Sequence, residues 1–299
     1  MAQNDIGIDL GTTTIIIAQE GKGVVLNQPS VVAMDTRKKT VLEAGDKALA
    51  MVGRTPNYIS AIFPLKDGVI SDHTMTRELI CRFVKQVYSS HMVKPRVAVC
   101  VPAAITGIES DAVVEAVVAA GARQVYLIDE PIAAALGSGI DITQPEGRMI
   151  IDIGGGTTDI AVLSMNGVAV SSSLKIAGNY FDEMIIRYVR RQHGVVIGQV
   201  TAESVKIQIG QVYPRDEERS MNIKGRDFKT GMPKMITLTS TEIYEVLRRP
   251  ARLIADEVLA VMEETSPELI SDISENGITI TGGCGQLWGM DLLLMERTG

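Results

Sequence analysis

One stretch of the chain combines acidic residues, glycines and hydroxyls in a pattern suited to binding phosphate. In residues 149–163 an apolar run leads to Asp152, a run of three glycines and two threonines follows, and Asp159 opens a second apolar run. This pattern predicts a β-hairpin whose turn carries almost no side chains. Consecutive glycines let backbone N–H groups approach a ligand closely and point the same way, which makes a nest for phosphate oxygens. Because a plain hairpin needs only two turn residues, the longer turn favours a ligand, although a tight hairpin selected for positive φ is the alternative.

A second copy of this pattern lies near the N-terminus. Residues 8–14 read IDLGTTT and residues 151–158 read IDIGGGTT, so both have Ile, Asp, an aliphatic residue, Gly and then small hydroxyls. Repeats roughly 140 residues apart indicate a duplicated domain rather than a solenoid. Two such domains, each with a phosphate-binding turn and an acidic residue at its entrance, would form one site in the cleft between them.

The elements between the two hairpins favour a parallel sheet. The strand pattern of residues 96–101, the helix pattern of 107–120 and the strand pattern of 124–128 follow one another, and a helix rich in small residues begins near Pro131. Glu130 stands at the carboxyl end of the last of these strands, where open α/β sheets place their ligand sites. The alternative is a structural one, because an acidic residue is also favourable at a helix N-terminus.

Two segments in the second half could contact a ligand. Residues 201–206, TAESVK, are predicted to start a helix with Thr201 as N-cap, on which Glu203 and Lys206 face the same way. A nucleotide contact and a surface ion pair are equally good interpretations of these two charges. Further on, a strand at residues 277–281 is followed by a glycine-rich junction and a helix from Gln286, which again allows close approach of the backbone to a ligand.

The remaining segments complete a two-domain organisation. We expect domain I over residues 1–144 and domain II over residues 145–299, each with a smaller inserted subdomain, at about 32–69 and about 179–240. Residues 55–67 look irregular. A long helix is predicted over residues 241–264, kinked or broken at Pro250.

Bulk properties exclude several classes of protein. The 299 residues carry a net charge of −7, which argues against nucleic acid as the main partner. The three cysteines, Cys81, Cys100 and Cys284, have no CxxC spacing, and the three histidines are isolated, so neither zinc nor a disulfide framework is expected. No apolar run approaches the length of a membrane-spanning helix, and the N-terminus runs almost directly into a strand pattern, which leaves no room for a signal peptide. These features predict a soluble cytoplasmic α/β protein.

Together the motifs carry a family resemblance. IDLGTTT (8–14), DEPIAAALG (129–137) and DIGGGTTDIAVLS (152–164) resemble the phosphate and connecting motifs of the actin, sugar-kinase and heat-shock-chaperone ATPase superfamily. Within it, MVGRTP (51–56), PLKDGVISD (64–72), KPRVAVCVP (94–102) and SPELISDI (266–273) are most similar to MreB-type bacterial actin homologues. The resemblance covers essentially the whole chain. It implies a duplicated actin-like ATPase fold of the ribonuclease H-like kind, with the nucleotide cleft between two domains.

The resemblance also implies a set of site residues for ATP and Mg²⁺. Glu130 and Thr157 would position the attacking water, Asp9 and Asp152 would orient waters on Mg²⁺, and Asp159 is a weaker candidate for the metal shell. The implied nucleotide-binding residues are Gly11, Thr12, Thr13, Gly154, Gly155, Gly156, Glu203, Ser204, Val205, Lys206, Gly282, Gly283, Cys284 and Gly285.

The function implied by the resemblance is ATP-dependent assembly into filaments beneath the cytoplasmic membrane. The partners would be further copies of the chain, the inner face of the membrane and the cell-wall elongation machinery. Met92 and Val93 lie where family members insert apolar residues into the bilayer, and Lys94 and Arg96 would suit anionic lipid. With so small an apolar pair, membrane binding would depend on avidity within a filament.

Two departures from the family pattern leave alternatives open. Cys284 replaces a glycine, which is expected to crowd the adenosine pocket, and the family continues beyond the position of Gly299 with a strand and a second connecting helix. A non-hydrolysing or inactive truncated scaffold is therefore the main alternative. A small-molecule kinase of the same fold is disfavoured, because no loop offers a general-base Asp with a sugar pocket.

Overall fold

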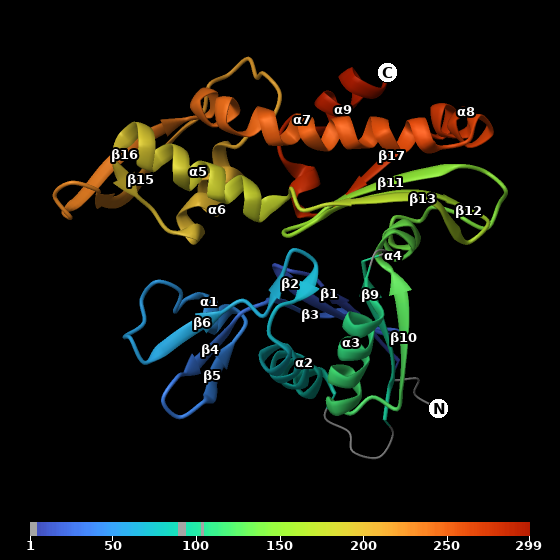
Figure 1. The fold of residues 1–299 in the computed structure, drawn as a ribbon, viewed down its shortest axis with the longest axis horizontal. Coiled ribbons are helices and arrows are strands. Elements are labelled where there is room, and N and C mark those ends of the chain that lie inside the picture. Colours follow the sequence, from blue (N-terminus) through green and yellow to red (C-terminus); the bar gives the residue numbers. More distant parts are fainter. Residues whose placement is uncertain (1–4, 89–93, 103–104) are drawn as a thin grey trace. The chain divides into compact units, whose positions relative to one another are not determined.

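The computed structural model describes residues 5–88, 94–102 and 105–299. The chain divides into two compact units, Met1–Ala133 and Ala134–Gly299, each with a hydrophobic core of its own. Each unit is built from a mixed sheet covered by helices (Figure 1). This α/β content in two related units is the duplicated fold that the repeated hairpin predicts.

A five-stranded sheet with the order β10-β9-β1-β2-β3 organises the first unit. Its strands are β1 (Ile6–Leu10), β2 (Thr14–Gln19), β3 (Gly23–Pro29), β9 (Arg96–Val101) and β10 (Gln124–Asp129). The first three form an antiparallel meander, whereas β9 runs parallel to both β1 and β10. Helices α2 (His73–Val87) and α3 (Gly107–Ala119) lie side by side against the sheet (Figure 1). Alternate residues such as Ile15 and Ile17 are buried beneath them, as expected for a sheet with one covered face.

A smaller sheet in the same unit has the order β5-β4-β6. It consists of β4 (Val32–Asp35), β5 (Thr40–Ala44) and β6 (Ile59–Ile62), accompanied by α1 (Asp46–Leu49). The short pair β7 (Leu65–Lys66) and β8 (Val69–Ile70) follows. The prediction of irregular structure over residues 55–67 was wrong, because β6 and β7 lie there. All four residues of β6 are half-buried, so the strand lacks an alternating pattern and is defined by its pairing with β4.

The second unit repeats the plan of the first. Its main sheet has the order β13-β12-β11-β17 and consists of β11 (Arg148–Ile153), β12 (Thr158–Ser164), β13 (Gly167–Leu174) and β17 (Ile278–Thr281). As in the first unit, a three-stranded antiparallel meander is joined by a parallel strand next to its first strand. A separate sheet contains β14 (Val195–Val196), β15 (Ser220–Asp227) and β16 (Pro233–Thr239).

The helices of the second unit depart from the sequence expectations in two places. They are α5 (Gly178–His193), α6 (Gln199–Ile209), α7 (Ser240–Glu264), α8 (Pro267–Asn276) and α9 (Met290–Thr298). The prediction of Thr201 as N-cap was wrong, since α6 begins at Gln199 with Gly198 at that position. A helix from Gln286 was also wrong: a 3₁₀ turn occupies Gly283–Gln286, and α9 follows Gly289, which has a φ of +79°.

Helix α7 continues through Pro250 as one element (Figure 1). The proline removes one backbone hydrogen bond from the helix. Its neighbours Leu247, Ala251 and Ile254 are completely buried in the core of the unit. Because packing of the apolar face supplies most of the stability of a helix in a protein, it offsets the lost bond.

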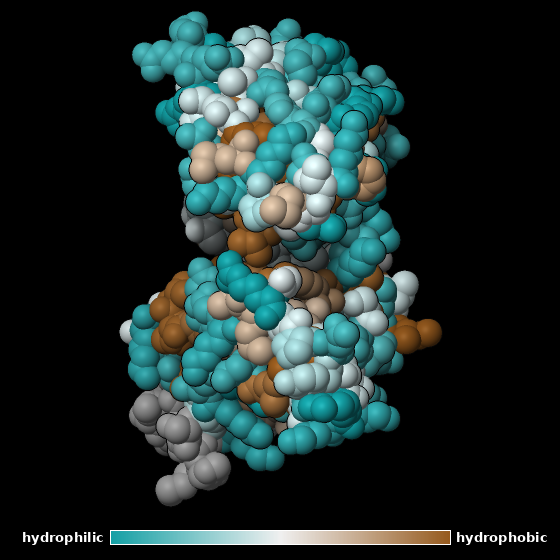
Figure 2. All heavy atoms as spheres, turned by 90° about the vertical axis from the view of Figure 1, so that its left-hand side faces the viewer, coloured by the Kyte–Doolittle hydropathy of each residue, from teal (hydrophilic) through white to brown (hydrophobic). Residues whose placement is uncertain are grey.

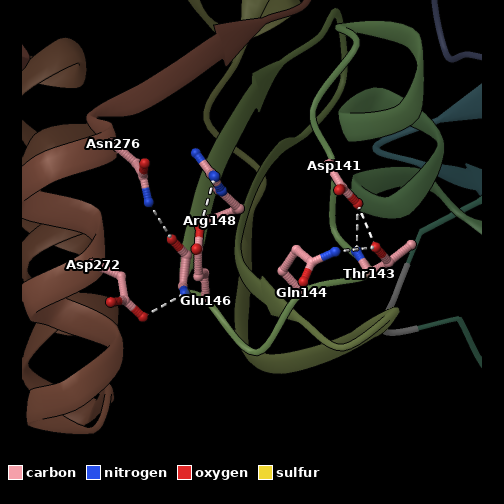
Figure 3. Close-up of polar contacts among 8 residues, drawn as sticks. Asp141, Thr143, Gln144, Glu146, Arg148, Asp272 and Asn276 are labelled. Carbon is pink, nitrogen blue, oxygen red and sulfur yellow. Dashed lines mark hydrogen bonds and ion pairs between the residues drawn. The ribbon is translucent and has the colours of Figure 1, made fainter.

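The loop before β11 is held in place by α8 (Figure 3). The backbone N–H of Gly147 donates to Asp272 Oδ2 at 2.8 Å, and Asn276 Nδ2 donates to the Gly147 carbonyl at 3.5 Å. A Cβ at Gly147 would lie 2.5 Å from the carbonyl oxygen of Leu269, so the close approach requires glycine. These contacts set the start of the strand that carries Asp152 near its end.

Hydrophilic residues cover most of the face drawn in Figure 2, and apolar residues gather there in a few groups. Among the described residues, no helix is both long and apolar enough to cross a membrane.

Candidate functional site

The two repeated hairpins have the same pairing register around their turns. Leu10 is paired with Ile15 and Ile153 with Thr158, so residues 11–14 and residues 154–157 form the two turns. Asp9 and Asp152 therefore occupy equivalent positions, one residue before the end of the first strand of each hairpin. The structure thus places an acidic residue and a Gly/Thr turn together in each unit.

The second turn is braced by the N-terminus of α5. The N–H of Gly178 donates to the Gly154 carbonyl at 3.1 Å, and the N–H of Asn179 donates to the Gly155 carbonyl at 2.8 Å. Within the turn, the Gly154 N–H donates to the Thr157 carbonyl at 2.9 Å. The helix start therefore uses its otherwise unpaired N–H groups to fix the glycine turn.

The first turn is braced by Ser30, a residue to which the sequence pattern gave no role. The Ser30 hydroxyl donates to the Gly11 carbonyl at 2.7 Å, and its N–H donates to the Thr13 carbonyl at 2.8 Å. The Thr12 hydroxyl accepts a bond from the Gly68 N–H at 2.9 Å, so this side chain anchors the β7–β8 turn. The Thr13 hydroxyl is buried and has no hydrogen-bond partner within the described part of the chain. An oxygen-rich ligand would satisfy it.

Gly282, in the glycine-rich junction after β17, packs directly against the end of β11. Its φ is +82°, and a Cβ there would lie 2.3 Å from the Ile153 carbonyl oxygen and 2.4 Å from Asp152 Oδ1. Only glycine accepts both the conformation and the contact. The predicted nucleoside segment is thereby packed against the predicted metal-site carboxylate.

A pocket of about 430 Å³ opens beside this junction, within the second unit. Lys206, Gly283 and Cys284, which were predicted from the sequence, line it. Other lining residues had no sequence signal; these include Gln208, Arg215, Arg219 and Trp288. The Arg215 guanidinium lies 4.2 Å from the centre of the Trp288 ring, which is a cation–π contact. The pKa of Arg215 is lowered, mainly by burial and to a smaller extent by the positive charge of Arg219. The pocket is large enough for a nucleoside and has one aromatic and several cationic groups on its wall.

The remaining nucleoside candidates lie outside the pocket lining. Glu203 and Ser204 are half-buried on α6, and Val205 is fully buried in the core. Gly282 and Gly285 are half-buried at the junction that follows β17.

Lys206 has a buried acidic partner that sequence reading did not identify. Its Nζ donates to Asp182 Oδ2 and to the Gly178 carbonyl, both at 3.0 Å, and the two charged residues are only 8% and 2% exposed. The interpretation of Lys206 as half of a surface ion pair was therefore wrong. Burial raises the pKa of Asp182 to about 6, an effect opposed by Lys206. The pair has no periodicity signal, because Asp182 lies on α5 and Lys206 on α6.

Cys284 is buried against this pair. A Cβ at Gly178 would lie 2.8 Å from Cys284 Sγ and 3.2 Å from Lys206 Nζ, so Gly178 provides the room for both side chains. Burial raises the pKa of the Cys284 thiol. Although Cys284 lines the pocket, it is only 8% exposed.

The predicted hydrolytic residues lie at the ends of elements in different units. Glu130 is the first residue of α4 (Glu130–Gly137), directly after β10, and Thr157 closes the second turn. Asp159, two residues further along β12, is 4% exposed and accepts hydrogen bonds from the hydroxyls of Ser173 and Thr157. Burial raises the pKa of this carboxyl, and the two hydrogen bonds oppose the rise.

The predicted membrane residues Met92 and Val93 lie outside the described residues. Of the two cations beside them, Arg96 is bound to Asp5, with its Nε at 3.1 and 3.0 Å from the two carboxylate oxygens. Arg96 is therefore already paired with an acidic residue, although its side chain remains 41% exposed. Its partner lies far away in sequence and is brought close by the parallel pairing of β1 with β9.

Comparisons with known proteins agree with this geometry. The family model of the MreB/Mbl protein matches residues 3–299. The cell shape-determining protein MreB of Escherichia coli (strain K12) is 48% identical over 305 residues, covering 100% of this chain and 88% of that protein. MreB5 of Spiroplasma citri has been solved with ADP and with AMPPNP; the ADP complex has a TM-score of 0.94 and 39% identity over 99% of this chain and 89% of that one.

A more distant structure, the MamK double helical filament, shares the fold. Its TM-score is 0.82 at 21% identity, covering 99% of this chain and 90% of that one.

Proposed function

Because the chain belongs to the MreB/Mbl family of actin-like proteins, we propose that it binds ATP and assembles into cytoskeletal filaments that determine cell shape. The observation that carries this proposal is the pair of equivalent Gly/Thr turns, each preceded by an acidic residue. Two turns of this kind match the triphosphate of a nucleotide, whose charge is spread over several oxygens.

We assign the phosphates to the backbone of Gly11–Thr13 and Gly154–Thr157, and the nucleoside to the pocket beside Gly283 and Cys284. Ser30 braces the first turn and α5 braces the second, which supports this assignment. A preorganised loop binds an anion more tightly because it loses less conformational entropy on binding. MreB5 has been solved in complex with ADP and in complex with AMPPNP. The chains in these two structures are 39% and 38% identical to this chain.

Mg²⁺ fits the donor set of the proposed site. Asp9 and Asp152 would hold it through water, and the Thr13 hydroxyl, which has no partner among the described residues, is a further oxygen ligand. Within the described chain no group of three or more His, Cys, Asp or Glu side chains gathers to hold a metal directly. A magnesium ion that keeps most of its waters requires no such group. When bound, it would neutralise charge on the phosphates.

For hydrolysis, we assign Glu130 and Thr157 to hold the attacking water. Phosphoryl transfer depends chiefly on the placement of the reacting groups and on charge stabilisation. These side chains therefore need only orient the water by accepting hydrogen bonds from it. A carboxylate accepts hydrogen bonds, and a threonine hydroxyl can donate one bond and accept others.

We further propose that the protein works at the inner face of the cytoplasmic membrane with the cell-wall elongation machinery. Cell shape determination by the E. coli relative supports this placement. Met92 and Val93 are the proposed apolar contact with the bilayer, and filament avidity would strengthen this weak anchor.

The test is to replace Glu130 by Ala. ATP should still bind, because the phosphate and nucleoside contacts remain, while phosphate release falls about 100-fold or more. Trp288 is the only tryptophan of the chain and lines the pocket, so its fluorescence reports binding. Sedimentation with and without ATP reports assembly.

The matched control is Glu115→Ala on the exposed surface of α3, which should behave as the wild type. Equal loss of binding and hydrolysis in the Glu130 variant would refute the assigned role. ATP-dependent sedimentation without phosphate release from the wild type would identify a non-hydrolysing scaffold instead.

A further inference from the structure

Three polar residues share one face of the main sheet in the second unit, and Thr157 lies in the turn that leads into it. Asp152 is paired with Asp159, and Asp159 is paired with Ser173, so the three lie in a row across β11, β12 and β13. Directly opposed residues in an antiparallel sheet point to the same face, as do residues two apart along a strand. Thr157 lies in the turn directly before β12, two residues from Asp159.

Asp159 holds two hydroxyl groups. It is 4% exposed and accepts hydrogen bonds from Thr157 and from Ser173. The bond from Ser173, on the neighbouring strand, restrains the carboxylate, and the bond from Thr157 uses the only hydrogen of that hydroxyl.

The first hairpin shows that the fold itself does not require this acid. The register places Ile16 opposite Asp9, where the second hairpin places Asp159 opposite Asp152. The same hairpin is thus built once with an aliphatic residue and once with a buried carboxyl. Burying a carboxyl is unfavourable compared with burying an isoleucine, so a structural explanation favours the aliphatic residue.

We propose that Asp159 is a positioning residue for ATP hydrolysis, which holds the hydrogen of the Thr157 hydroxyl so that Thr157 Oγ1 presents its lone pairs to the attacking water. This inference rests on the proposed role of Thr157. A water that donates to Thr157 has its own lone pair available for phosphorus. Without Asp159, the Thr157 hydroxyl is free to donate to the water or to a phosphate oxygen, and the water loses its orientation.

The first test compares Asp159→Ala with Asp159→Asn. The Ala variant should lose about 10- to 100-fold in kcat with little change in KM, as expected when a reacting group is misplaced. The Asn variant keeps an acceptor oxygen and should recover most of that loss. ATP binding, followed by Trp288 fluorescence, should be unchanged in both, which also shows that the variants are folded.

The second test is a double-mutant cycle with Thr157→Ala. If Asp159 acts through Thr157, removing Asp159 from the Thr157→Ala background should cost less than about threefold, because coupled residues are not additive. A merely structural acid would instead give independent, multiplying losses.

Ser172→Ala is the matched control, since Ser172 lies on the same strand but bonds to Glu257 on the other face. It should leave kcat unchanged, whereas Ser173→Ala should lower kcat. The proposal is overturned by an unchanged kcat in Asp159→Ala, or by losses that multiply. If Thr157→Ala leaves kcat unchanged, both the assigned role of Thr157 and this proposal are wrong. If Thr157→Ala lowers kcat but Asp159→Ala does not, this proposal alone is wrong and the proposed function is unaffected.

Discussion

At the scale of residues, the buried pair behind the pocket makes stability depend on pH. Burial raises the pKa of Asp182 from 3.8 to about 6, despite the Lys206 ammonium at 3.0 Å, and Glu203 adds a small repulsion. The Cys284 thiol also faces the pair. Between about pH 4 and pH 6 the folded protein keeps the Asp182 proton while the unfolded chain has released it. Because the folded state then binds more protons, this group lowers stability as pH rises through that range.

Asp182→Asn should remove this dependence, since the amide does not titrate. Relative to the variant, the wild type should lose roughly 2 kcal/mol of unfolding free energy between pH 4 and pH 7. Urea denaturation at a series of pH values measures it. Asp291→Asn, at an exposed position on α9, is the control and should give a curve parallel to the wild type. Parallel curves for Asp182→Asn as well would show that the carboxyl titrates at the same pH in both states.

At the scale of elements, the start of α7 ties two helices together. Thr239 and Glu242 form a capping box, in which the Thr239 hydroxyl accepts from the Glu242 N–H at 3.3 Å and Glu242 Oε2 accepts from the Thr239 N–H at 2.9 Å. Glu242 Oε1 also lies 3.0 Å from both Tyr188 and His193 of α5. The cap therefore contributes to packing of α5 against α7 as well as to the helix start.

Thr239→Ala should lower the free energy of unfolding by about 1 kcal/mol, through loss of the cap. Thr239→Ser, which retains the hydroxyl, should recover most of it. Ser266 occupies the N-cap of α8 without a side-chain cap bond, so Ser266→Ala should change stability by less than about 0.5 kcal/mol. Urea denaturation compares the three, and equal effects at the two N-caps would contradict this account.

At the scale of the whole molecule, the two units have separate cores, and each carries one of the two turns that we propose bind phosphate. Gly11–Thr13 belongs to the first unit, and Gly154–Thr157 belongs to the second. A ligand that binds only the folded protein stabilises it, by about 2.7 kcal/mol at a concentration of 100 times Kd.

ATP should therefore slow amide hydrogen exchange at both turns, because both are assigned to the same triphosphate. Exchange at residues 46–49 of α1, which have no assigned contact, serves as the internal reference. Mass-spectrometric hydrogen exchange with and without ATP measures the effect. Slowing at one turn alone would mean that one unit binds the nucleotide by itself.

The sequence alone determined the duplicated plan, the two turns and the acidic residue before each. These features are local: a strand, a turn and a return strand follow from spacing within about a dozen residues, and the second copy distinguishes the motif from a chance hairpin. The position of Glu130 at a strand end is equally local. For the same reason, the main helices and strands were predicted close to their observed bounds.

Only the tertiary structure decided which distant groups meet. Ser30 braces Gly11, Asp182 neutralises Lys206, and β6 is a strand because β4 lies beside it. The pocket wall is assembled in the same way, since a bridge between Gln211 and Trp288 joins the segment after α6 to the segment after β17. Such partners have no fixed spacing along the chain. Their identity depends on how helices and sheets pack, which is a property of the folded core and not of any local pattern.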